Sequence, residues 1–361
     1  MTIVAAKGIP LQIDPSGVEA FLRLAAQKEV DACDIESLIQ LPAYTRMASA
    51  LSHADVDLAR VFGVGVLHNV EQNGSVLKDP MAQRMAEAVR FAWEQHDRVA
   101  ELLASVREGL SAESIARKVR EYLPCETSTP AARITLLVGL AQGMQSGEDL
   151  LIDLPLALIL RPQDPLGNLE DTIAHELHHR WREGVAAEPH SDNPRFRGIV
   201  WVLEQFEGEG IATTLVDGGL DPQKGILREA EGMIRFFGEA VREVIDAWTI
   251  IYKGGHVAAL ARLEKAFEDV LRGSVGDDEV VERILSELDR NIDHPIGHMM
   301  ALRIQQELGH DALVRCVHRP FLFLHTYQSA ARRHGDPTKV YTFNDRTIVR
   351  LAESVFPSTG T

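Results

Sequence analysis

The chain has 361 residues, of which 45% are hydrophobic, so it is long enough to bury a full core in one large domain or in two. Its formal net charge of −16 argues against binding to nucleic acid or to an anionic membrane surface, because the phosphates would repel it. The same charge is compatible with cationic or neutral peptides as partners.

The cysteines and the first residues bear on where the protein works. Cys33, Cys125 and Cys316 lie far apart and form no C-x-x-C pair, so we interpret them as reduced packing residues. Residues 1–8 lack the apolar core of a secretory signal. The sequence also contains no run of about 18 apolar residues, so no membrane span is predicted. We therefore expect a cytoplasmic protein.

Residues 14–123 are predicted to be mostly helical. Apolar residues have helical spacing at 20–26, and residues 81–103 predict one long amphipathic helix rich in Ala, Glu, Gln and Arg. Prolines at 124 and 130 then interrupt this pattern.

Strand-like segments follow. Residues 133–140 predict a strand, residues 149–154 and 156–160 predict one or two more, and a glycine-containing turn is predicted at 142–147. A small sheet at this place could offer an edge strand to an extended peptide, or it could only support the core. Both interpretations stay open.

The pentapeptide HELHH at residues 175–179 matches the pattern H-E-x-x-H. It lies in a segment, 168–184, that predicts a short amphipathic helix. Asn168 is the expected N-cap, Asp171 follows three residues later as in a capping box, and Gly184 is the expected end.

On a helix, His175 and His179 lie one above the other on the same face and can present two imidazole nitrogens to one metal ion. Glu176 projects beside them and can take a proton from a water molecule at the metal, as in zinc peptidases. His178 points away from this pair, so a surface role or a supporting role behind the ligands is expected for it. The alternative is a helix whose histidines only cap or pack.

A catalytic zinc usually takes a third protein ligand. The extended pattern H-E-x-x-H-x-x-G-x-x-H fails, because Arg182 and Val185 stand where it needs Gly and His. A glutamate from the next predicted helix, residues 197–216, is the other common solution.

Glu209 is favoured as this ligand, because Gly208 and Gly210 flank it. Each glycine inside a helix costs about 1 kcal/mol relative to alanine, which suggests a close helix approach or access to an ion. Glu204 and Glu207 stay as alternatives.

These segments resemble a known family. H-E-x-x-H followed by Glu209-Gly210-Ile211-Ala212 is similar to gluzincin-type zinc-dependent peptidases, a bacterial family of uncharacterised function in which E-G-x-A lies on the next helix. The run HPIGHMMA at 294–301 resembles the C-terminal motif of that family, although a tyrosine is expected near His294. The resemblance implies a metallopeptidase.

The resemblance also implies a hydrogen-bond donor opposite the metal, since gluzincin-like chemistry must hold a tetrahedral oxyanion. His294 is the first candidate for this role and Tyr327 is the second. A packed or surface position stays open for each of them.

The sequence thus predicts an α+β fold that is predominantly α-helical, with a small β-sheet before the H-E-x-x-H helix and a zincin-like core. We expect an N-terminal helical region (1–128), a catalytic core (129–219) and a C-terminal helical region (220–361). The predicted function is a zinc-dependent peptidase with Zn²⁺ as cofactor and a peptide or protein as substrate. The alternative is a non-catalytic helical protein with a structural or vestigial zinc site.

Overall fold

The structure is a computed structural model that describes residues 11–357 apart from 53, 55, 68–76, 78, 218–231, 235 and 275–291. The chain divides into two compact units. Unit 1 comprises Met1–Lys118, Thr129–Arg180 and Glu229–Val241, and unit 2 comprises Val119–Ser128, Trp181–Arg228 and Arg242–Thr361. Unit 1 joins the N-terminal helices to the small sheet, which the sequence pattern assigns to separate regions. The division into three regions stays a prediction.

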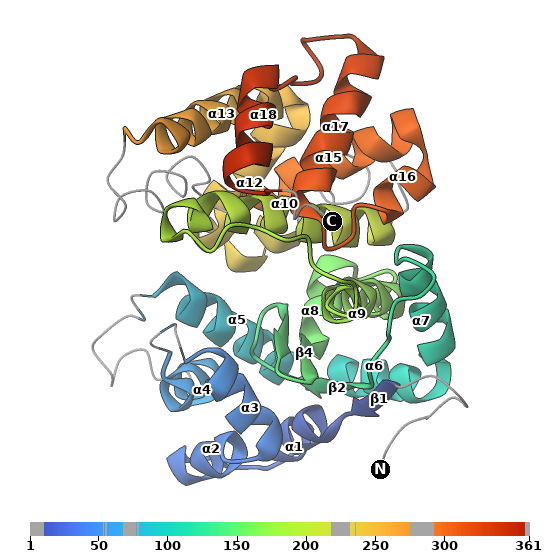
Figure 1. The fold of residues 1–361 in the computed structure, drawn as a ribbon. Helices are drawn as coiled ribbons and strands as arrows, with labels where there is room; N and C mark the ends of the chain where they lie inside the picture. The colour runs from blue at the N-terminus through green and yellow to red at the C-terminus, as the bar shows by residue number, and fades with distance from the viewer. Residues whose placement is uncertain are drawn as a thin grey trace. The chain divides into compact units, whose positions relative to one another are not determined.

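Unit 1 contains a small mixed sheet, whose described strands have the order β1-β2-β4-β3 (Figure 1). The strands are β1 (Leu11–Asp14), β2 (Ala132–Leu137), β3 (Gly143–Ser146) and β4 (Asp149–Asp153). β2 pairs in parallel with β1 and with β4, whereas β3 pairs with β4 in the antiparallel direction. β3 is therefore an edge strand of the sheet.

Two predictions for this part of the chain are wrong. The predicted turn at 142–147 contains strand β3, and the turn is reduced to the residues around Gly147, whose φ is +59°. The predicted strand at 156–160 belongs instead to helix α8 (Leu154–Leu160). Asp153 caps this helix by accepting a hydrogen bond from the Leu156 N–H at 3.3 Å, and Pro155 suits its first turn.

The helices before β2 are α1 (Ser16–Ala25), α2 (Ala32–Ile39), α3 (Pro42–Ala50), α4 (Leu58–Leu67), α5 (Pro80–Glu94), α6 (His96–Gly109) and α7 (Ala112–Glu121). The long helix predicted at 81–103 is therefore two helices. They meet at Gln95, whose φ of −112° and ψ of 27° leave the helical region. α1 packs closely on the sheet, since a Cβ on Gly17 would lie 2.8 Å from the Leu136 carbonyl oxygen.

Helix α9 (Pro165–Arg182) carries the H-E-x-x-H motif. The elements after it are η1 (Pro194–Phe196), α10 (Arg197–Asp217), α12 (Glu239–Ile250), η2 (Ile251–Gly255), α13 (His256–Arg272), α15 (Asp293–Leu308), α16 (His310–Val314), α17 (Pro320–His334) and α18 (Asp345–Ser354). Within unit 2, α10 and α15 lie side by side (Figure 1).

Two glycines allow the close approach of α10 and α15. A Cβ on Gly210 would lie 2.4 Å from the carbonyl oxygen of Gly297, and a Cβ on Gly297 would lie 2.5 Å from that of Phe206. No other residue fits at either position without moving a backbone. A close helix approach was one of the two reasons expected for the glycines beside Glu209, and at Gly210 it is confirmed.

The predicted fold class is confirmed, because the described chain is mainly helical and its small sheet precedes the H-E-x-x-H helix. The helices expected after residue 222 are present where the chain is described, and residues 222–231 and 275–291 lie outside the described residues. Within the described ranges, no helix is both long enough and apolar enough to cross a membrane.

Candidate metal centre

Helix α9 begins earlier than its sequence suggests. Asp164, and not Asn168, stands at its start and accepts a hydrogen bond from the Gly167 N–H at 3.1 Å, with Pro165 in the first turn. Asn168 is buried within the helix. Asp171 is not part of a capping box: its carboxylate pairs with Lys118 at 2.7 Å and with Arg161 at 3.0 Å.

The apolar face of α9 fixes the orientation of its histidines. Leu177 and Trp181 are fully buried, whereas His175, Glu176 and His179 are partly exposed. One face of the helix therefore packs into the core, and the two predicted ligands and the predicted base lie on another face.

His178 is fully buried, which excludes the surface position considered for it. Its ring lies 6.3 Å from the ring of His179, measured between centroids. A supporting role behind the ligand pair is the interpretation that remains.

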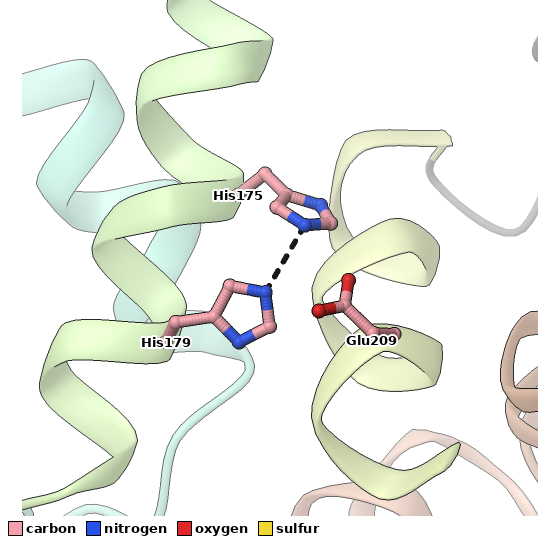
Figure 2. A group of neighbouring side chains, drawn as sticks. All are labelled: His175, His179 and Glu209. Atoms are coloured by element: carbon pink, nitrogen blue, oxygen red, sulfur yellow. Dashed lines mark hydrogen bonds between the residues drawn. The ribbon is translucent and has the colours of Figure 1, made fainter. Parts of the chain in front are cut away.

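Helix α10 supplies the carboxylate that the sequence favours. His175, His179 and Glu209 each offer one ligand atom, and these three atoms all lie within 4.8 Å of one another. Figure 2 shows the carboxylate of Glu209 on the side to which both imidazoles point. Among the described residues, this is the group of His, Cys, Asp and Glu side chains that could hold a metal ion.

The two alternative glutamates lie elsewhere on α10. Glu207 is fully buried and forms an ion pair with Arg182, so its charge is already matched. Glu204 is partly exposed, and neither residue belongs to the group of potential ligands found in the described chain. The geometry thus supports Glu209 over both of them.

The donor set fits zinc. The Nε2 atoms of His175 and His179 are 3.1 Å apart (Figure 2). Two nitrogens at bond lengths of 2.0–2.1 Å from a tetrahedral zinc would be separated by roughly 3.3 Å. Two imidazoles and one carboxylate also match the ligands of catalytic zinc sites that keep a fourth position open. The two imidazoles could therefore accept the ion with small movements.

His294 lies beside the third predicted ligand. Its Nε2 atom is 3.2 Å from Oε2 of Glu209, and its Nδ1 atom is 3.4 Å from Oδ1 of Asp293. The ring stacks on Trp248 of α12 with 5.9 Å between centroids and 21° between planes. Sequence reasoning missed Asp293 and Trp248; the position next to His294 could have suggested the first, but no signal marked the second.

Tyr327 has a different setting. It is fully buried on α17, and its hydroxyl oxygen accepts a hydrogen bond from the Tyr341 N–H at 3.2 Å. Burial raises the pKa of Tyr327 to about 12. These contacts support a packing role within unit 2 and do not bring the hydroxyl to Glu209 or His294.

The predicted base lies against the edge strand of the sheet. A Cβ placed on Gly143 of β3 would come within 2.8 Å of Oε1 of Glu176 and within 2.9 Å of its Cγ. Glycine is therefore the residue that lets the Glu176 side chain rest on this strand. Sequence reasoning read Gly143 only as part of a turn.

Fold and site together define a class: a mainly helical α+β protein with an H-E-x-x-H helix and a candidate metal centre of two histidines and one carboxylate. The chain belongs to the family described as "Putative zinc dependent peptidase (DUF5700)", whose model matches residues 35–336. This match confirms the family resemblance seen in the sequence and zinc as the metal on which the family depends. No curated protein and no solved structure matches the chain.

Proposed function

We propose that the protein is a zinc metallopeptidase that hydrolyses peptide bonds, with Glu176 as general base. The observation that carries the proposal is the convergence of His175, His179 and Glu209, whose ligand atoms lie within 4.8 Å of one another. The family description points to the same reaction class.

In this proposal His175, His179 and Glu209 hold the zinc ion. When bound, zinc lowers the pKa of a water ligand to about 7 and polarises the scissile carbonyl. The chain itself contributes the remaining steps, which are the transfer of a proton, the binding of the oxyanion and the alignment of the substrate.

Glu176 moves the proton. It follows His175 directly on α9, and its carboxylate rests on Gly143 at the edge of the sheet. From there it accepts a proton from the attacking water and later delivers it to the nitrogen of the leaving amine. The contact with Gly143 limits the positions open to the carboxylate, which favours an efficient transfer.

His294 is the proposed donor to the oxyanion. Its Nε2 atom already lies near the Glu209 carboxylate, and the stacking on Trp248 restricts rotation of the ring. An N–H in this position can donate to a developing negative charge. We leave Tyr327, the second candidate, out of the mechanism because its buried hydroxyl is bonded to the Tyr341 backbone.

The proposed substrate is an extended peptide that pairs with β3. This strand is at the edge of the sheet, and its residue Gly143 touches Glu176. Main-chain hydrogen bonds to an edge strand hold a peptide without regard to its side chains. A peptide bound in this way would present its backbone beside the general base.

The experiment that tests the function compares the wild type with Glu176→Gln in zinc content and in cleavage of a peptide library. We expect both proteins to bind one zinc ion per chain and only the wild type to cleave. Glutamine keeps the size of the side chain but cannot accept the proton. Equal cleavage by the two proteins would exclude Glu176 as the base. Zinc binding without cleavage by either protein would favour the non-catalytic alternative.

A further inference from the structure

An ion pair between Arg182 and Glu207 joins the last residue of α9 to the middle of α10. The Glu207 side chain is completely buried, and the Arg182 side chain is 16% exposed. Removing two charges from water is costly, so a pair of this kind is weak evidence for stability. Its presence calls for another explanation.

The same carboxylate also fixes a strained loop. Oε1 of Glu207 accepts a hydrogen bond from the His318 N–H at 3.0 Å, and the φ of His318 is +59°. The His318 ring donates from Nδ1 to the Val185 carbonyl at 2.7 Å, and its own carbonyl accepts from the Glu188 N–H at 3.0 Å. A non-glycine residue in this region persists only when its surroundings hold it there.

The position of the pair relates it to the proposed zinc ligands. Arg182 follows His179 by three residues on α9, and residues three apart share one face of a helix. Glu207 precedes Glu209 by two residues on α10, so the two carboxylates point about 160° apart around the helix axis. A rotation of α10 that moved Glu209 would therefore move Glu207 as well.

Gly208 lies against the Arg182 side chain of this ion pair. A Cβ on this residue would lie 3.5 Å from the guanidinium carbon of Arg182, at ordinary contact distance. A longer side chain would occupy the space through which the guanidinium group passes along α10. The first of the two glycines beside Glu209 thus leaves room for alanine next to the Arg182 side chain, whereas at the second only glycine fits the contact with α15.

We propose that Arg182 and Glu207 are positioning residues for the metal centre, and that their ion pair sets the rotation of α10 that directs Glu209 towards His175 and His179. This proposal rests on the zinc site of the proposed function. Buried charges are best known for fixing register between packed elements. Residues behind the ligands of metal sites commonly change metal affinity by 10- to 100-fold when they are replaced.

The test measures zinc affinity by competition with a chromophoric chelator in the wild type, Glu207→Gln, Arg182→Met and the double variant Arg182→Met/Glu207→Met. We expect each single variant to bind zinc about 10-fold or more weakly than the wild type. Removing one partner leaves a buried charge unmatched and can unfold the chain, so circular dichroism must accompany each titration.

The double variant tests the proposal if the single variants unfold, because it removes both charges and so leaves no unmatched buried charge. We expect it to fold, to bind zinc about 10-fold or more weakly than the wild type, and to give an altered absorption spectrum with Co²⁺, which reports ligand geometry. Zinc binding as tight as that of the wild type, with an unchanged Co²⁺ spectrum, would overturn the proposal.

The matched control is Arg46→Met. Arg46 is similarly buried and pairs with Asp14 and Asp149, each at 3.2 Å, within the sheet region of unit 1. We expect this variant to lose stability while its zinc affinity stays unchanged. An equal loss of zinc affinity in the control would show that any weakened ion pair has this effect and would also overturn the proposal. A wild type that binds no zinc would instead refute the proposed function, and the positioning role with it.

Discussion

The imidazole of His294 lies 3.2 Å from the carboxylate of Glu209, measured from Nε2 to Oε2, and stacks on the indole of Trp248. This places a hydrogen-bond donor next to the third predicted zinc ligand while its ring is held from one side. The same nitrogen could steady Glu209 before the reaction and donate to the oxyanion during it. Replacing His294 separates these roles. Loss of the contact with Glu209 would weaken metal binding, whereas loss of the donor to the oxyanion would lower turnover and leave metal binding unchanged.

We predict that His294→Phe lowers kcat by about 100-fold or more, which is the usual cost of one oxyanion donor. Phenylalanine keeps the stacking surface for Trp248 and removes both ring nitrogens. Zinc affinity, measured in parallel, is expected to change much less than kcat. The matched control is Tyr327→Phe, which removes the hydroxyl of the second candidate and should retain full turnover. Wild-type kcat in His294→Phe would remove this residue from the mechanism.

Gly143 gives a second prediction, on the placement of the proposed general base, Glu176. A methyl group at this position would come within 2.8 Å of Oε1 of Glu176, so Gly143→Ala must displace the carboxylate. We expect kcat to fall by about 10-fold or more, because general-base catalysis depends on hydrogen-bond reach. Zinc stoichiometry should stay at the wild-type value. Ser146→Ala on the same strand is the control, and an equal loss of kcat in it would assign the effect to the strand and not to Glu176.

The two glycines beside Glu209 are predicted to differ in their tolerance of alanine. Gly210→Ala brings a Cβ within 2.4 Å of the Gly297 carbonyl oxygen, and the resulting separation of α10 and α15 should cost about 1–3 kcal/mol in the free energy of unfolding. Gly208→Ala meets the Arg182 guanidinium at an ordinary 3.5 Å, and alanine favours a helix by about 1 kcal/mol over glycine. Chemical denaturation of both variants checks this, and equal stabilities would refute the close-approach argument.

The centre of the candidate site could be predicted because its information is local. His175 and His179 are placed by helix periodicity alone, and Glu176 lies next to the first of them. Helix periodicity alone does not identify Glu209, since several glutamates share α10. The flanking glycines and the family resemblance favour it. Among the described residues Glu209 belongs to the group that could hold a metal ion, whereas the charge of Glu207 is matched by Arg182.

The parts that could not be predicted depend on distant contacts or on caps. β1 has four residues and gains its pairing from β2, far along the chain, so its sequence alone carried little signal. The apolar run of α8 has no clear period, and the cap from Asp153 decides its helical form. The break at Gln95 and the stacking of Trp248 on His294 likewise have no signature in a single sequence.

Asp153 links the end of β4 to the loop before β3. Its side chain is buried and accepts hydrogen bonds from the backbone N–H groups of Ala141 at 2.6 Å and Leu156 at 3.3 Å. Burial raises the pKa of this carboxyl from 3.8 to about 6, although the backbone donors act in the opposite direction. The folded protein therefore keeps the proton to a higher pH than the unfolded chain does.

This difference predicts how stability depends on pH. Between about pH 4 and pH 6 the unfolded chain binds fewer protons than the folded protein at this position, so the free energy of unfolding falls as the pH rises. The contribution of Asp153 to the free energy of unfolding is fully present below its pKa in the unfolded chain, 3.8. It is lost as the pH rises through its pKa in the folded protein, about 6. The loss amounts to about 3 kcal/mol at most, given 1.36 kcal/mol for each pKa unit.

Asp153→Asn isolates the effect, because asparagine stays neutral at every pH while the other titrating groups remain the same. We expect the variant to gain stability relative to the wild type by about 1–3 kcal/mol between pH 4 and pH 7. Denaturant unfolding of both proteins in EDTA measures this gain without a contribution from metal binding. Asparagine also removes one acceptor oxygen. This loss shifts the free energy of unfolding of the variant by the same amount at every pH and does not change how it depends on pH. A stability difference that is the same at pH 4 and pH 7 would show that Asp153 titrates at an ordinary pKa and that its backbone donors offset the effect of its burial.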